Sequence, residues 1–518
     1  MQSNSVTFST LNYDILHAIC DELIYLYSYQ RSFVCRPPCL LPLSMTCRRI
    51  RELLAPSIFR EVRNRRRLLC NTDDYPDNTV WPRNIWKHIE LVVLENEGKY
   101  SMDIVTVASM IPQLPRLKQV RFEMDVAPPE VLLHATAIAG IRSLVFTKIR
   151  LDGPPLTDVF SKSKLTNLLL TVGPYRPRNL DAPCELDHVA GILSILSKTL
   201  IYLKISGDLV SFKTLADLDW PCLRTLTLID HVPYGQVMPL PLVISHMPLL
   251  LNLHYNFGAT SLGRIPPIVF WFENQDFASL ANTHPCLKSL SMSNVYPPEH
   301  TLDELPEGLR SLRILALREQ NRETLRGPWY PFSPLREDDA FRILANASLL
   351  PNLIDLALTL EDLPSPVLLK AVTEACPRLC NLEISQGLFE RKQVESPYST
   401  ESLAEPLIRL RFLCDLRISI GFGKQYTGSV FYGLRDKTPL LLRMEAAAQV
   451  FACKLTHLNS VSFSFENDGL YAGLRELVIW YRYRITNGGD GKPLIVKPDI
   501  ETMYQASSEP GPKICGFV

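Results

Sequence analysis

The sequence predicts an α/β solenoid: an N-terminal helical module, then an irregular arc of repeats with a parallel sheet on its concave face. Three observations predict this fold. One short pattern of apolar residues recurs along most of the 518 residues, a proline often stands at the same place before it, and the stretches between copies have helical periodicity.

The recurring pattern is apolar-x-x-apolar-x-apolar, as in PCLRTLTL at 221–228. Its last two apolar residues are two apart, so both side chains point to one face of a strand, and the first enters the same core from the preceding turn. Six copies carry a proline two residues before the first apolar position, and seven lack it. The thirteen begin at Leu117, Leu223, Leu250, Leu287, Leu353 and Leu379, and at Ile141, Leu165, Leu200, Leu312, Leu413, Leu458 and Leu474.

The proline and the intervening stretches define the rest of each unit. Proline cannot continue a helix and favours extended backbone before it, so a helix ends there and a strand follows. Stretches such as 185–200 have helical spacing, with apolar residues at Val189, Ile192, Leu193 and Leu196. Because every connection runs the same way, the strands are expected to be parallel.

These units resemble leucine-rich repeats across residues 85–480. The asparagine usual after the second strand leucine is mostly absent, which implies variable helices and protruding loops rather than a regular horseshoe. A weaker copy, WKHIEL at 86–91, is a candidate for the first repeat. The last two copies begin 16 residues apart, at Leu458 and Leu474, which favours a capping hairpin over a full unit. Residues 481–518 are expected to form a C-terminal cap or tail with a disordered end.

Residues 9–62 have a different pattern. The stretch LNYDILHAICDEL at 11–23 gathers its apolar residues on one broad helix face, and a second helix is expected over 42–56, ended by Pro56. Two consecutive prolines between these helices predict a loop insertion at 24–39.

This segment resembles the F-box, a helical module that binds the Skp-type adaptor of cullin–RING ubiquitin ligases. Asn12 and Asp14 stand where the usual opening has proline and glutamate, and Thr46-Cys47-Arg48 matches the usual valine-cysteine-arginine stretch. The order of this segment and the repeats resembles F-box/leucine-rich-repeat proteins of the fungal type. The resemblance implies an adaptor-binding role for Leu11, Ile15, Leu16, Ile19, Leu23, Leu43, Cys47 and Ile50.

No motif predicts catalysis, a cofactor or a metal site. The ten histidines are dispersed, the glycines of TNGGDGKP at 486–493 lack the spacing of a phosphate loop, and the closest cysteine pairs have no neighbouring histidine. Thirteen cysteines without a secretory signal indicate reduced thiols in the cytoplasm or nucleus. No apolar run approaches the ~20 residues of a membrane span, so no membrane partner is expected.

The charge balance, 54 basic against 54 acidic residues, removes any general attraction to nucleic acid. The arginine-rich stretch REVRNRRRL at 60–68 is either a basic patch or a strand that enters the array, and no second basic stripe accompanies it. A protein partner is expected instead, because alternate strand positions carry small polar residues and mixed charges. The residues chosen for target binding on the concave face are Arg121, Tyr202, Thr227, His254, Ser291, Asp355, Glu383 and Arg417.

Together these features predict a substrate receptor of a cullin–RING ubiquitin ligase that catalyses nothing itself. Its F-box would bind the Skp-type adaptor and thereby the cullin, and its repeats would hold an unknown target protein. The alternative is a repeat scaffold whose N-terminal helices only cap the open edge of the solenoid.

Overall fold

The computed structural model describes most of the repeat region and little of the N-terminal segment. The described ranges are 48–63, 81–95, 104–124, 128–147, 157–161, 163–172, 183–230, 240–257, 280–294, 305–316, 334–387, 396–422, 438–467, 477–487, 493–495 and 499–502, with Leu16, Met45, Leu151, Pro233, Met238 and Leu302. The chain divides into two compact units. The first comprises Met1–Gly173 and Leu180–Leu200, and the second comprises Pro174–Asn179 and Ile201–Val518.

The first unit alternates strands with helices or short 3-10 turns (η). Its elements are α3 (Arg48–Ile58), β1 (Glu61–Arg63), η3 (Arg83–His88), β2 (Leu91–Glu95), α4 (Ile104–Met110), η4 (Ile111–Gln113), β3 (Gln119–Glu123), α5 (Glu130–Ile138), β4 (Ser143–Thr147), α6 (Thr157–Phe160), β5 (Asn167–Thr171) and α7 (Pro183–Leu196). Strands β1 to β5 pair in chain order, and every pair is parallel.

The second unit continues this alternation from β6 to β9 and from β10 to β14. Its elements are β6 (Tyr202–Ser206), η5 (Gly207–Leu209), α8 (Phe212–Asp217), β7 (Thr225–Asp230), α9 (Leu240–Ile244), β8 (Asn252–Phe257), α10 (Leu280–Thr283), β9 (Ser289–Ser293), β10 (Ser311–Leu315), α11 (Glu337–Ala347), β11 (Asp355–Leu360), α12 (Pro366–Ala375), β12 (Asn381–Gln386), α13 (Thr400–Leu407), β13 (Asp415–Ile418), α14 (Thr438–Lys454), β14 (Ser460–Asn467), β15 (Leu477–Asn487), β16 (Pro493–Ile495) and β17 (Asp499–Thr502). Strands β6 to β14 pair in chain order and in parallel.

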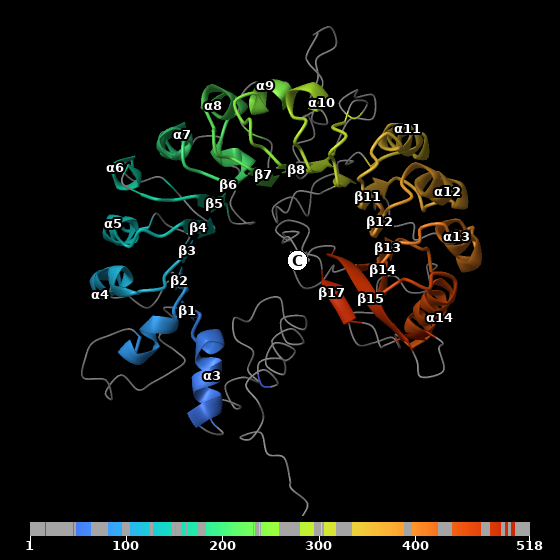
Figure 1. Cartoon of the computed structure of the whole chain (residues 1–518), viewed down its shortest axis with the longest axis horizontal. Helices are drawn as coiled ribbons and strands as arrows, with labels where there is room; N and C mark the ends of the chain where they lie inside the picture. Colours follow the sequence, from blue (N-terminus) through green and yellow to red (C-terminus); the bar gives the residue numbers. More distant parts are fainter. Residues whose placement is uncertain are drawn as a thin grey trace, which may run out of the picture. The chain divides into compact units, whose positions relative to one another are not determined.

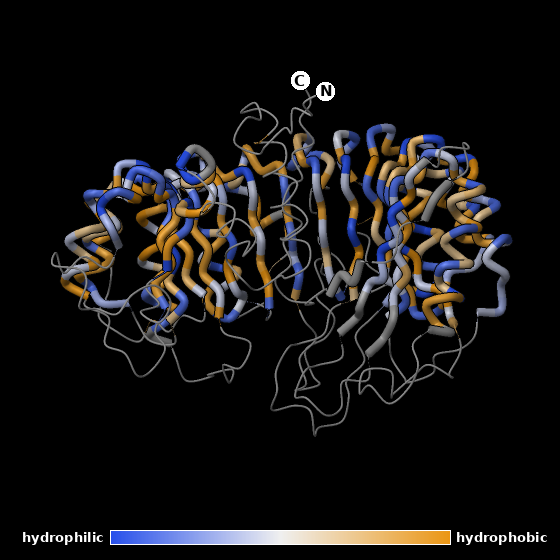
Figure 2. The backbone as a smooth tube through the Cα atoms, turned by 90° about the horizontal axis from the view of Figure 1, so that it is seen from below, coloured by the Kyte–Doolittle hydropathy of each residue, from blue (hydrophilic) through white to orange (hydrophobic). Residues whose placement is uncertain are grey.

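Within each unit the helices from α4 onward lie along one side of the strands (Figure 1). The predicted α/β solenoid is therefore confirmed by parallel pairing and by this layering. Figure 2 shows how hydrophobic and hydrophilic residues alternate along the strands. We call the sheet face opposite the helices the inner face, and the layer between sheet and helices the core.

The core contains the apolar positions of the repeated pattern. In β7 both Leu226 and Leu228 are fully buried, and Leu223 enters the same layer from the turn, as expected. Helix α7 likewise buries Val189, Ile192, Leu193 and Leu196, the residues predicted from their helical spacing. The local pattern thus specifies both layers that meet in the core.

For two copies of the pattern, the predicted start differs by three residues from the frame that the strand pairing shows. Leu91 pairs with Gln119 and Ser311 with Ser289, so the in-phase copies begin at Ile89 and Leu309 rather than at Trp86 and Leu312. In both places apolar residues recur every third position, so two frames satisfy the same pattern. A shift of three residues exchanges the core and inner faces, because side chains alternate along a strand.

The N-terminal segment departs from its prediction at Pro56. This proline lies inside α3, which continues to Ile58, and the Phe59 amide donates to the Ala55 carbonyl at 2.9 Å. Proline removes one hydrogen bond here, close to the end of the helix, where carbonyl groups already lack intrahelical partners. The predicted loop insertion at 24–39 lies outside the described residues.

The arginine-rich stretch begins with a strand. Strand β1 pairs in parallel with β2, and Val62 is buried in the core, so the sheet starts upstream of the predicted boundary at residue 85. Residues 64–68 lie outside the described ranges. For 61–63, the strand alternative is confirmed.

The parallel sheet ends in an antiparallel hairpin. Strand β15 pairs with β14 in the antiparallel direction from Ser460–Arg484 to Asn467–Leu477, which confirms the predicted hairpin. Strands β16 and β17 pair with β15 in turn. The rings of Phe451, Phe463 and Tyr483 form the core beneath it, with centroids 6.0–6.1 Å apart.

A substitution in β7 tests the strand assignment. Leu228→Ala should lower the free energy of unfolding by about 2–5 kcal/mol, because it removes buried methyl groups and leaves a cavity. Thr227→Ala, on the inner face, should leave the thermal midpoint nearly unchanged. Equal losses in thermal melts of the two variants would contradict the assignment.

Candidate protein-binding surface

The inner face of the second unit carries three rows of side chains, one residue from each strand. The strand register aligns the middle row as Lys204, Thr227, His254, Ser291, Arg313, Ala357, Glu383, Arg417, Ser462 and Arg482, from β6 to β15. The row therefore combines hydroxyl groups with charges of both signs.

Five of the eight predicted target-binding residues lie in this middle row. They are Thr227, His254, Ser291, Glu383 and Arg417.

Three predicted residues lie elsewhere. Asp355 lies in the neighbouring row on β11, and Tyr202 lies in the same neighbouring row on β6. Arg121 is on β3 of the first unit, whereas the other seven residues are on strands of the second unit.

An ion pair crosses one whole strand at the centre of this surface. The Arg313 guanidinium on β10 donates to the Glu383 carboxylate on β12 at 2.8 Å and lies 3.5 Å from the Asp355 carboxylate on β11. Ala357 of β11 lies between the two partners in the row and is fully buried. A small residue is needed there because neighbouring strands are about 4.8 Å apart and the arginine must reach over the middle one.

The cluster extends to the hairpin. Arg417 lies 3.7 Å from the Glu383 carboxylate, and its guanidinium carbon is 6.0 Å from the centre of the Trp480 ring. Arg482 donates to the Asp415 carboxylate at 3.0 Å. We call Arg313, Asp355, Glu383 and Arg417 the inner-face charge cluster.

The protein environment stabilises the charged forms in this cluster. Burial would raise the pKa of Glu383, but Arg313 and Arg417 outweigh it and hold that pKa below its ordinary value. Burial would likewise lower the pKa of Arg313, and Glu383 with Asp355 raises it instead. The side chains of Arg313 and Glu383 are only 18% and 13% exposed, so each charge depends on its partner.

Arg313 is absent from the residues chosen by sequence, and the reason is the frame of its repeat. The copy beginning at Leu312 places Arg313 outside the strand positions that face inward. The alternative copy LRSLRI at 309–314 fits the same pattern and places Arg313 on the inner face, as the structure does. The signal was therefore present in the sequence but ambiguous.

His254 lies in the same row and is uncharged at neutral pH. Burial, together with the positive charges of Arg313 and Lys204, lowers its pKa to about 4. Its Nδ1 atom is buried without a hydrogen-bond partner among the described residues. The ring therefore adds shape and polarity to the surface without adding charge.

The half-buried imidazole, whose Nδ1 atom is fully buried, predicts a pH dependence of stability. Above pH 6.5 the ring is neutral in both states, and as the pH falls toward 4 only the unfolded chain takes up the proton. The folded state should lose about 3 kcal/mol relative to the unfolded state over this range. His254→Gln should lose correspondingly less when urea unfolding is compared at pH 7 and pH 4. The exposed His457, replaced in the same way, controls for the loss of an imidazole as such.

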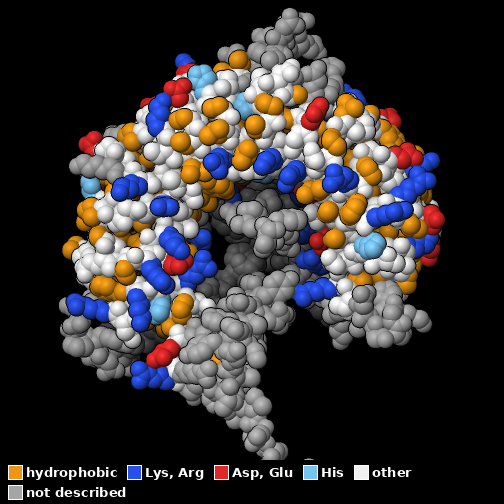
Figure 3. Space-filling view, in the orientation of Figure 1, with side chains coloured by type: hydrophobic (Ala, Val, Ile, Leu, Met, Phe, Trp, Pro, Cys, Tyr) orange, Lys and Arg blue, Asp and Glu red, His pale blue; other side chains and the backbone are white. Residues whose placement is uncertain are grey.

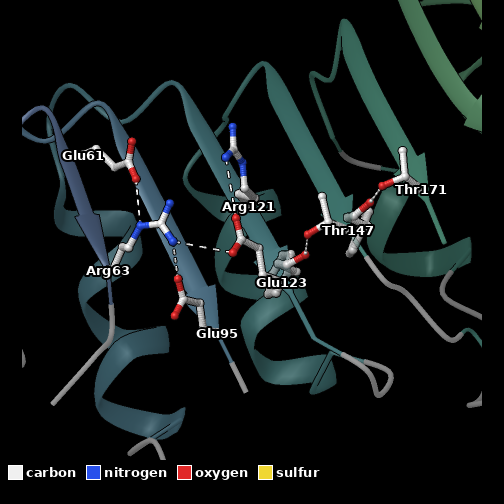
Figure 4. A network of polar contacts seen from close by, with 9 residues as sticks. Glu61, Arg63, Glu95, Arg121, Glu123, Thr147 and Thr171 are labelled. Atoms are coloured by element: carbon white, nitrogen blue, oxygen red, sulfur yellow. Dashed lines mark hydrogen bonds and ion pairs between the residues drawn. The ribbon is translucent and has the colours of Figure 1, made fainter. Parts of the chain in front are cut away.

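The first unit has its own network on the inner face, shown in Figure 4. Arg63 of β1 contacts three carboxylates: Glu61 at 2.9 Å, Glu95, and Glu123 at 3.6 Å. Arg121 in turn lies 3.6 Å from Glu123. The predicted binding residue Arg121 is thus part of an ion-pair network, and Arg63 is engaged within the unit rather than presented as part of a basic patch.

Most residues assigned to adaptor binding lie outside the described residues. Leu16 is 1% exposed, which places its side chain in the interior. Ile50 belongs to α3, but its side chain is not described. The other six are Leu11, Ile15, Ile19, Leu23, Leu43 and Cys47, and their assignment stays a prediction.

Two searches of the described residues bear on other kinds of site. No group of three or more histidine, cysteine, aspartate or glutamate side chains there could hold a metal ion. No helix in the described part of the chain is long and apolar enough to span a membrane.

Comparison with known proteins gives weak structural likenesses. No family model matches the sequence, and no curated protein matches it. The chain is similar to a solved structure of the Drosophila Toll–Spatzle complex, with 14% identity, a TM-score of 0.31 and coverage of 74% of this chain and 46% of the other. It is also similar to a TLR13–ssRNA13 complex, with 13% identity, a TM-score of 0.25 and coverage of 65% and 58%. The chain thus spans about half the length of these proteins, and its repeat fold is established by its own strand pairing.

Proposed function

We propose that this chain is a non-catalytic substrate receptor of a cullin–RING ubiquitin ligase. The F-box-like segment would bind the Skp-type adaptor, and the repeats would bind a target protein. Such a receptor accelerates transfer by holding target lysines near the charged enzyme, which raises their effective concentration.

The observation that carries the proposal is the junction between the F-box-like segment and the repeats. Helix α3 ends at Ile58 and strand β1 begins at Glu61. Leu54 and Ile58 of this helix are buried, at 1% and 6% exposure. A helix joined this closely to the sheet would hold a bound adaptor in a fixed orientation to the first unit.

The inner-face charge cluster supports a protein target. Arginine and tryptophan are enriched among the residues that dominate protein interfaces, and here Arg417 lies over the Trp480 ring. A rigid sheet holds them, so little conformational entropy is lost on binding.

Co-purification tests the proposal. A tagged full-length chain, expressed in its own cells, should retain the Skp-type adaptor and the cullin through washing. Absence of both from a folded, soluble preparation would contradict the ligase role. The capped scaffold would then take its place, supported by the same burial of Leu54 and Ile58.

A charge reversal on the inner face separates target binding from adaptor binding. Arg417→Glu should remove the target from the set of proteins labelled by a proximity enzyme fused to the chain, because it places three carboxylates together with Glu383 and Asp415. The adaptor should still be labelled. Lys370→Glu on the exposed side of α12 is the matched control and should keep both. If the Arg417→Glu variant labels the same set of proteins as the wild type, target binding at this cluster is contradicted.

A further inference from the structure

A second surface of the second unit lies at the edge of the sheet where the strands begin. The carbonyl group of the residue just before each strand accepts hydrogen bonds from backbone amides of the next repeat. This continuous ladder aligns these residues in one row. Examples are Leu251 N to Arg224 O at 2.8 Å, Lys288 N to Leu251 O at 2.7 Å and Arg310 N to Lys288 O at 2.8 Å. We call Ile201, Arg224, Leu251, Lys288, Arg310 and Ile354 the edge row.

The three basic side chains of the edge row are exposed and unneutralised. Arg224, Lys288 and Arg310 form no ion pair with any described residue. The corresponding row of the first unit differs, because Glu90 lies there between Arg60 at 3.2 Å and Lys118 at 3.0 Å. The positive charges of Arg224, Lys288 and Arg310 are therefore accessible to a partner.

Few acidic groups accompany these cations. In the turns that precede β7 to β11, the described acidic residues are Asp219 and Glu307. Asp219 lies 3.0 Å from His246, and Glu307 is exposed in the turn before Arg310. Figure 3 shows basic side chains along the rim of this unit, with hydrophobic side chains among them.

The other three positions of the edge row are aliphatic: Leu251 lies between Arg224 and Lys288, and Ile201 and Ile354 flank the basic stretch. Ile201 and Ile354 are 40% and 37% exposed, and Leu251 is half-buried. The adjoining turns add Leu249 and Leu349, which are 48% and 69% exposed. Large aliphatic side chains exposed at one edge mark an interaction surface when polar residues surround them.

This mixture of basic and aliphatic positions favours a peptide over a nucleic acid. A phosphate backbone is bound through basic groups at successive positions, and unpaired bases are bound on aromatic platforms. Here half of the edge row is aliphatic, which offers neither. A peptide that carries both carboxylates and aliphatic side chains matches both kinds of position.

We propose that the edge row binds an extended acidic and aliphatic segment of a partner protein. Its carboxylates would pair with Arg224, Lys288 and Arg310, and its aliphatic side chains would cover Ile201, Leu251 and Ile354. From β6 to β11 the row spans about 24 Å, which an extended segment of about seven residues covers. This surface is separate from the inner-face charge cluster and does not depend on adaptor binding.

Fluorescence anisotropy with a defined probe tests the proposal. The probe is a labelled twelve-residue peptide of alternating glutamate and leucine, titrated with the full chain. Arg224→Glu combined with Arg310→Glu should weaken binding by about a hundredfold, since two attractions become repulsions. Ile354→Ser should weaken it by about tenfold through lost aliphatic contact. Lys213→Glu combined with Lys370→Glu, exposed on α8 and α12, gives the same net charge and should leave binding unchanged.

The other outcomes overturn the proposal. Equal weakening by the α8 and α12 pair would show attraction to net charge alone. A labelled single-stranded oligonucleotide that binds more tightly than the peptide, with sensitivity to the arginine pair but not to Ile354→Ser, would replace the peptide with a nucleic acid. Thermal melts confirm that each variant is folded. If the double reversal unfolds the chain, Arg224→Gln with Arg310→Gln is used, and undiminished peptide binding by that pair also overturns the proposal.

Discussion

Glu383→Ala should lower the free energy of unfolding of the second unit by about 3 kcal/mol. The reason is the pair that it breaks. Arg313 is 18% exposed and donates to Glu383 at 2.8 Å, so removing the carboxylate leaves a largely buried guanidinium with Asp355 alone, at 3.5 Å. Arg417 loses the contact with the Glu383 carboxylate, at 3.7 Å, in the same substitution. Urea unfolding monitored by far-UV circular dichroism measures the loss.

Two further variants make the interpretation specific. Arg313→Met combined with Glu383→Leu should recover most of the lost stability, because replacing both buried charges with apolar groups of similar size removes the uncompensated charge. Glu405→Ala, whose side chain is 66% exposed beside Lys454, should cost less than about 1 kcal/mol. A Glu383→Ala loss no larger than that of Glu405→Ala would show that the cluster is a solvated surface pair.

Ile15→Asp combined with Ile50→Asp should abolish co-purification of the Skp-type adaptor and the cullin. The prediction rests on the proposed F-box, in which apolar side chains of the two helices meet the adaptor. Burying a large aliphatic side chain stabilises by about 1.5–3 kcal/mol, and forcing a carboxylate into that contact costs several more. Two such changes together exceed what a protein interface of ordinary affinity can absorb.

The control for this pair is a carboxylate placed elsewhere on α3, the helix that contains Ile50. Ser57→Asp introduces a charge at an exposed position of α3 and should leave adaptor binding intact. Thermal melts of the double variant should retain the transition of the repeats, and target association through the second unit should persist. Wild-type recovery of the adaptor by the folded double variant would refute the F-box and favour the capped scaffold.

The strands and the core could be predicted from sequence because their signal is local. Leu226 and Leu228 lie two residues apart, and Leu223 lies three residues before Leu226. The strand, the turn and the buried face therefore follow from one short pattern. The proline before Leu223 marks the turn in the same stretch. The inner-face positions Glu383 and Arg417 follow by alternation. Each of these inferences needs only the neighbours of a residue along the chain.

The pairing of side chains across strands was decided by the tertiary structure. Arg313 and Glu383 are 70 residues apart, and their contact depends on the register of three strands and on the small Ala357 between them. The sequence left that register open, because Leu309, Leu312 and Leu315 fit two frames that place Arg313 on opposite faces. The edge row was hidden for the same reason: Arg224, Lys288 and Arg310 become neighbours only when the backbone ladder aligns their turns. Periodicity fixes which face a residue occupies within its own strand, whereas its neighbours on that face come from other repeats, across loops whose length the pattern does not constrain.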